Sequence, residues 1–317
     1  HPCWGTRMMD AEFVQLSLTP IVIGMLASIA CALPGNFLLL RGQALVSDAI
    51  SHVVLPGIIA AFLVTGTVTA WPMMIGAAAA AIVAVLMIET VKRLGKVESG
   101  AAMGVVFTTL FATGVLLLEQ TDTSAVHLDV EHALYGNLES LVWFDATGWD
   151  SLTDAAALAG LPPQLGRLAI VTLGMIGFIA LFWRPLVIST FDRVFAQAIG
   201  IRVTLVGFAL VVATAVAAVA AFDAVGSIIV ISMFICPPAA ARLMTDRLGR
   251  QVAWSIVFAI MSAVLGYVLA GYGPGWFGAP HALSAAGTIA AVSGLILGLA
   301  CLFGPRRMRS GQGAEAA

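Results

Sequence analysis

The sequence predicts an all-α polytopic membrane protein with eight to nine membrane-spanning helices. Of its residues, 60% are hydrophobic and only 10% are charged, whereas soluble domains have roughly 45–50% and 25%. Apolar runs of about twenty residues, the length that crosses a hydrocarbon layer of roughly 30 Å, also recur along most of the chain. We therefore expect the bilayer to be the main solvent of this fold.

Nine apolar segments are candidate spans, or eight if one of them is re-entrant. They are residues 18–39, 49–68, 71–91, 101–118, 168–187, 203–221, 225–241, 252–271 and 284–303. Together they define a predicted membrane domain over residues 18–305. Residues 1–17 are expected to form an N-terminal tail whose first part is an upstream-translated or vector-derived stretch. Residues 306–317 are expected to form a disordered polar tail. Small residues dominate 76–84 and 213–221, which favours close helix packing there.

The basic residues predict the orientation in the membrane. Thirteen of the fifteen Lys and Arg residues fall into five groups, at Arg41 and within 92–96, 184–202, 242–250 and 306–309. All five groups lie on one side if nine spans alternate. Short cytoplasmic loops are enriched in Lys and Arg, so we expect this side, with the C-terminus, to be cytoplasmic and the N-terminus to lie outside an inner (plasma) membrane.

A long acidic segment, 119–167, falls on the opposite, extracytoplasmic side of this predicted topology. Trp143 and Trp149 within it are suited to the aromatic belt at a membrane surface.

One predicted span carries two ionisable side chains near its start. Asp48 and His52 are four residues apart and share a helix face, where a carboxylate oxygen and an imidazole nitrogen can bind one cation. Ionisable groups inside a membrane are costly and usually face a pathway. Pro56 lacks an N–H and leaves the carbonyl of His52 without its helical partner. An equally compatible interpretation is a helix N-cap formed by Ser47 or Asp48.

A second stretch, residues 221–242, contains an acid and a proline pair. Pro237 and Pro238 each leave a carbonyl one turn earlier without a donor, which predicts a broken helix beside a gate or interface. Asp223 is a candidate pathway carboxylate. It also occupies the place of a solvated turn acid, where two predicted spans meet at the outer surface.

Residues 190–199 are predicted to form a short amphipathic helix on the basic side. Ser189 with Asp192 fits a capping box, and Gly200 fits a helix stop. The apolar side chains at spacings i, i+3, i+4 and i+7 are Phe191, Val194, Phe195 and Ala198. A single internal Arg is a poor signature for a helix that lies on lipid, so docking into a groove on a partner protein is favoured.

Further candidate metal ligands lie in the acidic segment: His127, Asp129, Glu131 and His132. In an extended chain the first three point to one side and could capture a metal ion, although a solvated acidic loop is the commoner explanation. The four cysteines form no CxxC pair and are expected to be free thiols.

The sequence contains no phosphate-binding GxxxxGK[ST] loop, no HExxH and no GxSxG. We therefore expect no enzyme activity and no permanently bound cofactor, and uphill transport would need energy from a partner or an ion gradient. Nucleic-acid binding receives no support.

These stretches, in this order, resemble the permeases of zinc, manganese and iron ABC importers. The resemblance is carried by residues 35–41, 48–52 with 55–57, 191–200, 221–227 and 237–241, and covers about residues 18–305. Residues 126–129 with 134–136 resemble the manganese- and iron-leaning branch.

The resemblance implies the metal-importer ABC permease fold and the transport of a divalent transition metal, manganese first and then zinc or iron, into the cytoplasm. It implies three partners: a cytoplasmic ATP-binding subunit, an extracytoplasmic metal-binding protein and a second permease, identical or a sister subunit. It also implies that Asp48 and His52 lie on the ion path and that the helix 190–199 couples to the ATPase. The alternative is a proton-coupled secondary metal transporter, which would need neither a docking helix nor a partner.

Overall fold

The computed structural model describes residues 13–66, 70–120, 138–146, 148–276 and 283–305. Within these residues the regular secondary structure is helical throughout. Eight of the described helices are long and apolar enough to cross a membrane. This confirms the prediction of an all-α polytopic membrane protein.

The first four membrane-length helices follow the predicted spans closely. They are α2 (Thr19–Leu40), α3 (Leu45–Thr65), α4 (Ala70–Gly95) and α5 (Ser99–Gln120). A π-helical turn, η1 (Val14–Leu18), leads directly into α2, and the apolar helix therefore begins inside the predicted tail 1–17.

Three short helices precede the next span: η3 (Leu138–Ser140), η4 (Trp149–Thr153) and α7 (Ala155–Ala159). The span itself, α8 (Pro163–Leu181), starts five residues before the predicted 168, so the segment 119–167 ends in a membrane-length helix. The reason is local, because Pro163 stands in the first helical turn, where its missing N–H has no intrahelical partner to lose.

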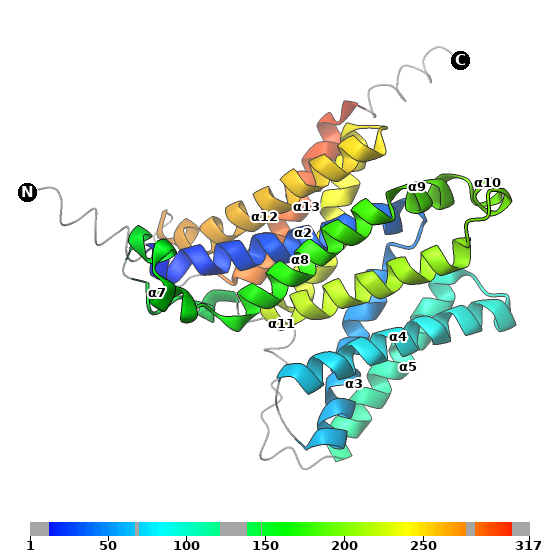
Figure 1. The fold of residues 1–317 in the computed structure, drawn as a ribbon, viewed down its shortest axis with the longest axis horizontal. Helices are drawn as coiled ribbons and strands as arrows, with labels where there is room; N and C mark the ends of the chain where they lie inside the picture. The colour runs from blue at the N-terminus through cyan, green and yellow to red at the C-terminus, as the bar shows by residue number, and fades with distance from the viewer. Residues whose placement is uncertain (1–12, 67–69, 121–137, 147, 277–282, 306–317) are drawn as a thin grey trace, which may run out of the picture.

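The remaining helices are α9 (Trp183–Phe191), α10 (Arg193–Ala198), α11 (Val203–Met244), α12 (Leu248–Trp276) and α13 (Ala285–Phe303). With 42 residues, α11 would be about 63 Å long if straight, roughly twice the hydrocarbon thickness. Its backbone departs from helical geometry at Gly226, with φ 77° and ψ 171°. In Figure 1, α11 starts beside α10 and the chain enters α12 on the same side of the bundle. The two predicted spans 203–221 and 225–241 are therefore the two segments of α11.

The helices form two groups (Figure 1). One consists of α3, α4 and α5. In the other, α8, α11 and α12 pack against α2, and α13 packs against α11 and α12. Close packing by small residues joins α3 to α4, since a Cβ on Gly57 would lie 2.7 Å from the Cα of Ala77. The buried alanines Ala217, Ala218 and Ala221 of α11 likewise confirm the predicted small-residue interface.

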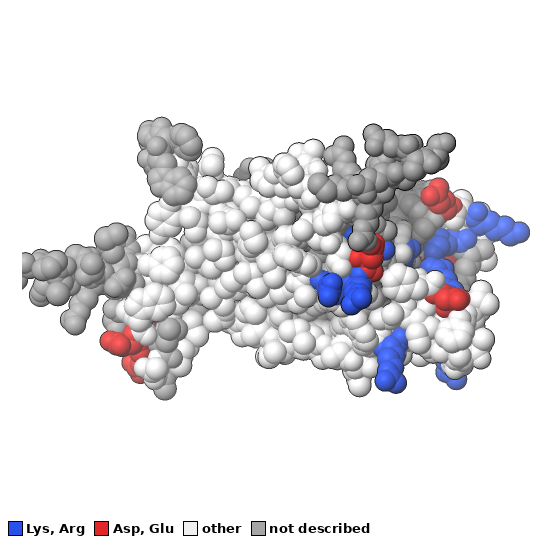
Figure 2. Space-filling model, turned by 90° about the horizontal axis from the view of Figure 1, so that it is seen from above, with Lys and Arg blue, Asp and Glu red and all other residues white. Residues whose placement is uncertain are grey.

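The visible basic side chains gather toward one end of the long axis of the molecule (Figure 2). Figure 2 shows the visible Lys and Arg side chains at the end of the molecule where α9 and α10 lie in Figure 1. We call this the basic end. Arg193 belongs to α10 there, and Arg41, Lys92 and Arg202 line the same cavity as Arg193.

Near the opposite end, the two tryptophans have different environments. Trp143 is only 1% exposed, and its indole N–H donates to the carbonyl of Ala157 at 2.8 Å. The interfacial prediction is therefore wrong for Trp143, which forms a small buried core with Val14 and Ala146. Trp149 is 49% exposed, as expected for an interfacial residue.

Candidate functional site

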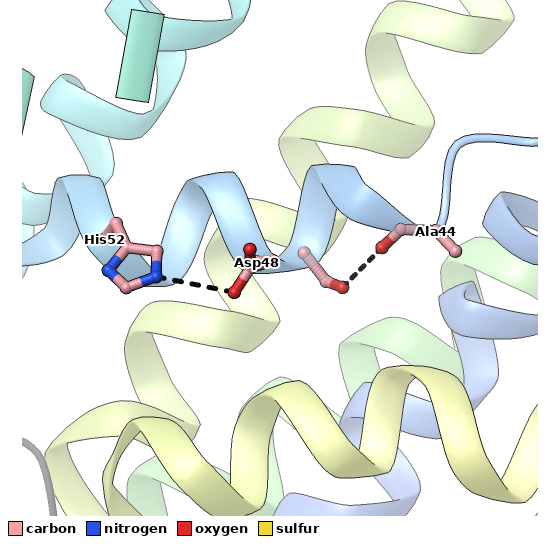
Figure 3. A network of polar contacts seen from close by, with 4 residues as sticks. Ala44, Asp48 and His52 are labelled. Carbon is pink, nitrogen blue, oxygen red and sulfur yellow. Dashed lines mark hydrogen bonds and ion pairs between the residues drawn. The ribbon is translucent and has the colours of Figure 1, made fainter. Parts of the chain in front are cut away.

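Asp48 and His52 lie one turn apart on α3 and face each other (Figure 3). The carboxylate Oδ1 of Asp48 and the imidazole Nε2 of His52 are 3.5 Å apart, and the side chains are 31% and 39% exposed. Ionisable groups that face hydrocarbon are costly. This open face of an apolar span therefore suits an aqueous path or a second protein chain better than lipid.

The alternative interpretation, a helix cap, is wrong. The N-cap of α3 is Ala44, and no side chain caps the helix. The hydroxyl of Ser47 donates back to the carbonyl of Ala44 at 2.8 Å, while Asp48 stands in the first turn, where the helix dipole favours negative charge. The Asp48 carboxylate thus remains free to act together with His52.

Helix α5 holds the histidine ring in place. The imidazole stacks on Phe107 with ring centroids 5.2 Å apart and meets the edge of Phe111 at 6.0 Å. One turn further along α3, buried Pro56 packs against Gly114 so closely that a Cβ there would lie 2.7 Å from the Cβ of Pro56. These contacts with α5 orient the imidazole ring of His52.

The geometry of the pair fits a divalent cation. Nitrogen and oxygen ligands at 2.0–2.2 Å from a tetrahedral metal stand about 3.4 Å from each other, close to the observed 3.5 Å. Among the described residues, no three His, Cys, Asp or Glu side chains come together. Further ligands would therefore have to be water, backbone oxygens or groups from another chain.

Asp223 lies apart from this pair, in an ion pair with Arg167 of α8 whose Nη2–Oδ2 distance is 2.8 Å. Another guanidinium nitrogen, Nη1, lies 3.1 Å from the sulfur of Met74 on α4. Arg167 therefore links three helices near the Gly226 break. The candidate ligands His127 and Asp129, with Glu131 and His132, lie outside the described residues.

The proline pair does not break its helix. Pro237 and Pro238 are buried within the second segment of α11, and the break lies at Gly226 instead. The carbonyl oxygen of Phe234, which Pro238 leaves without a helical donor, sits directly against Gly35 of α2, where a Cβ would collide with it. The prolines therefore lie where α11 packs closely against α2.

The predicted helix 190–199 is two elements joined at Asp192. Ser189 does not cap it, because Ser189 is buried in α9 and accepts a hydrogen bond from Arg41. Asp192 is the N-cap of α10, accepting from the backbone N–H of Phe195 at 2.8 Å.

At the C-terminal end of α10, Gly200 has φ +85° and donates to Gln197, while Ile201 donates to Ala196. This is the glycine stop that the sequence predicts. Phe191, Val194 and Phe195 are 57%, 79% and 53% exposed, and they form an apolar face that the described residues do not cover.

Sequence reasoning did not single out a buried polar network between α2 and α12. The amide nitrogen of Asn36 donates to Ser255 at 2.7 Å, and Gln251 donates to the amide oxygen of Asn36 at 3.1 Å. All three are fully buried. Their presence within apolar runs is the signal that would have found them, because such residues join helices in membranes.

The sequence matches the ABC 3 transport family over residues 13–145 and 158–301. It is 39% identical to the manganese transport system membrane protein MntD of Bacillus subtilis, covering 90% of this chain and 91% of that protein. It is 35% identical to the zinc transport system membrane protein TroD of Treponema pallidum, covering 92% and 75%.

A solved structure, PsaBC from Streptococcus pneumoniae in complex with Fab, superposes with a TM-score of 0.74 at 23% identity. The likeness covers 96% of this chain and 97% of that one, so the fold is shared. The match to the family spans most of the chain, and the alignment with MntD covers a similar share. This chain belongs to the ABC 3 transport family.

Proposed function

We propose that this chain is the membrane-spanning permease subunit of an ATP-binding-cassette importer that moves a divalent transition metal into the cytoplasm. Manganese is the favoured cargo, with zinc or iron next, since the relatives named above are manganese and zinc transport proteins. The observation that carries the proposal is the Asp48–His52 pair, partly exposed on an apolar span at a separation suited to one cation.

The pair is half of a metal site. A second permease, identical or a sister subunit, that faces this one across the path would add a second carboxylate and imidazole. Such a mixed oxygen and nitrogen set suits manganese, iron or zinc. The metal would pass between the two α3 helices after release from an extracytoplasmic metal-binding protein.

The energy would come from a cytoplasmic ATP-binding subunit at the basic end. Enrichment of Lys and Arg there supports a cytoplasmic position for that end and for the C-terminus. The exposed apolar face formed by Phe191, Val194 and Phe195, together with Ala198, would dock on the subunit, and Asp192 and Gly200 would fix the helix ends. Closure of the ATPases would then rock the permeases and open the path alternately to each side.

Membership of the ABC 3 transport family and the uncovered face of α10 both favour this mechanism over proton-coupled secondary transport. A secondary transporter would need no docking helix. Retention of uptake in cells without the ATP-binding subunit would favour the secondary mechanism.

The test of the pathway is uptake of radiolabelled manganese, zinc and iron in cells that lack this chain. Complementation with the wild type should restore one metal, whereas Asp48→Ala and His52→Ala should not, although both reach the membrane in normal amounts. Asp150→Ala, which removes an exposed carboxylate at the opposite end, is the matched control and should restore uptake. Normal uptake in both pathway variants would refute the role of the pair.

Docking is tested separately by copurification of the ATP-binding subunit. Phe195→Asp should abolish recovery of that subunit, because a charge would replace the centre of the apolar face. Phe144→Asp makes the same change at a side chain that is 73% exposed near the opposite end, and should have no effect. An intact complex with Phe195→Asp would count against docking through α10.

A further inference from the structure

The basic end contains a cavity of about 960 Å³ between α4 and the first segment of α11, bordered by the end of α2 and by α10. We call it the basic cavity. Its charged lining residues are the cations Arg41, Lys92, Arg193 and Arg202 and a single acid, Glu89. The carboxylate Oε2 of Glu89 lies 3.6 Å from Nζ of Lys92 and offsets its charge. The three arginines therefore account for the net positive charge of the lining.

Arg41 is fixed at the wall of this cavity. Its Nε donates to the hydroxyl of Thr190 at 3.0 Å and its Nη2 to the hydroxyl of Ser189 at 2.7 Å. Both partners are neutral and leave the guanidinium charge uncompensated. Burial, and then the neighbouring charge of Arg193, lower the pKa of Arg41 to about 10. A bound anion would act against both effects, because a nearby negative charge favours the charged guanidinium.

Room for this side chain comes from α11. Gly207 lines the cavity, and a Cβ there would stand 3.3 Å from Nη1 of Arg41. The guanidinium therefore lies beside open space, where its planar N–H donors can reach a phosphate oxygen.

The cavity also has apolar walls that belong to membrane-spanning helices. Leu86 of α4 and Leu205 and Phe208 of α11 line it and are 51%, 59% and 36% exposed. Basic side chains beside exposed apolar side chains suit an amphiphilic ligand with an anionic headgroup. The same charge repels a divalent cation, which separates this cavity from the path at Asp48 and His52.

We propose that the basic cavity binds the phosphate headgroup of an anionic phospholipid from the adjoining leaflet. Basic pockets between membrane helices are suited to such headgroups. An acidic side chain of the ATP-binding subunit is disfavoured by the geometry of α10. Arg193 and Gln197 line the cavity, whereas the exposed Val194 and Phe195 of the docking face do not. The bound lipid would join α4 to α10 and α11 at the basic end.

The test is native mass spectrometry of the full-length chain in detergent, titrated with phosphatidylglycerol or with phosphatidylcholine of identical acyl chains. The wild type should retain one phosphatidylglycerol in preference to phosphatidylcholine. Arg193→Gln with Arg202→Gln should bind it roughly thirtyfold more weakly, and Arg202→Gln alone roughly fivefold, from the usual contribution of each basic side chain near an anionic headgroup. The matched control, Arg247→Gln with Arg250→Gln, alters two arginines at the start of α12 that do not line the cavity and should bind as the wild type does.

Three results of the lipid titration, and one of copurification, would overturn the proposal. Equal binding of both lipids by the wild type would remove the anionic preference, and unchanged phosphatidylglycerol binding in the single and double variants would place the lipid elsewhere. Displacement of phosphatidylglycerol by equimolar inorganic phosphate would assign the cavity to a free anion. The double variant is also tested for copurification of the ATP-binding subunit, because loss of that subunit with unchanged lipid binding would assign these arginines to the partner.

Discussion

The contact between α3 and α4 makes a quantitative prediction at Gly57. This residue is buried where the two helices approach, and a Cβ on it would lie 2.7 Å from the Cα of Ala77, the Cβ of Ala80 and the carbonyl oxygen of Gly76. Two of these three atoms are backbone and cannot turn aside by a change of rotamer. Gly57→Ala therefore forces the helices apart.

The size of the effect follows from the geometry. The new Cβ is about 0.7 Å short of the 3.4 Å at which ordinary contact begins, and overpacking of this kind costs about 1–3 kcal/mol. Replacement of glycine by alanine also favours the helix by about 0.8–1.0 kcal/mol. Gly104→Ala on α5 isolates that gain, because nothing lies within 4 Å of the Cβ it would introduce.

The measurement is the thermal unfolding midpoint of both variants in the same detergent. The free energy of unfolding of Gly57→Ala should be about 1–3 kcal/mol lower than that of Gly104→Ala. This difference lowers the unfolding midpoint by roughly 2–10 °C for a chain of this size. Equal midpoints would refute the claim that glycine is required at this helix contact.

Two other predictions concern single polar contacts. Arg167→Ala should lower the free energy of unfolding by about 0.2–1 kcal/mol, because the Asp223 carboxylate, whose side chain is 38% exposed, loses its ion-pair partner; the same change in an Asp223→Ala background should cost less, as a double-mutant cycle of unfolding midpoints measures. Asp192→Ala should reduce copurification of the ATP-binding subunit, because loss of the N-cap destabilises α10 by about 0.5–2 kcal/mol; Asp192→Asn keeps an acceptor oxygen and should restore it.

Each of these predictions has a contrary outcome. Additive losses in the cycle would mean that Arg167 and Asp223 do not stabilise each other. Equal recovery of the ATP-binding subunit with alanine and asparagine at position 192 would separate the cap from docking.

The candidate site was predictable because it is local. Asp48 and His52 belong to one helix, and a spacing of four residues places them on one face whatever surrounds that helix. The spans were predictable for a related reason, since crossing hydrocarbon requires a continuous apolar run of fixed length. The cap at Asp192 and the stop at Gly200 also depend on a few adjacent residues, although the sequence alone favoured Ser189 at the start.

The errors concern residues whose partners are distant in the sequence. Trp143 stands in a polar, acidic stretch of sequence that suggests a surface position. In the fold, the carbonyl of Ala157 accepts its indole N–H, and Ala157 packs beside it in a small buried core. A further break was expected at the prolines, yet the carbonyl that Pro238 leaves without a helical donor lies against Gly35 of α2, and the helix continues. The break between the two predicted spans lies at Gly226, which adopts a positive φ that other residues rarely tolerate.

The sequence by itself determined that this chain is a bundle of membrane helices with one basic end, a carboxylate–imidazole pair on one span and a short amphipathic helix between two others. Tertiary structure alone decided that α5 orients His52, that Arg167 neutralises Asp223, and that four cations surround one cavity. The physical reason is range: hydropathy, helical spacing and charge counts act along the chain, whereas ring stacking, ion pairing and cavity formation depend on segments that only folding brings together.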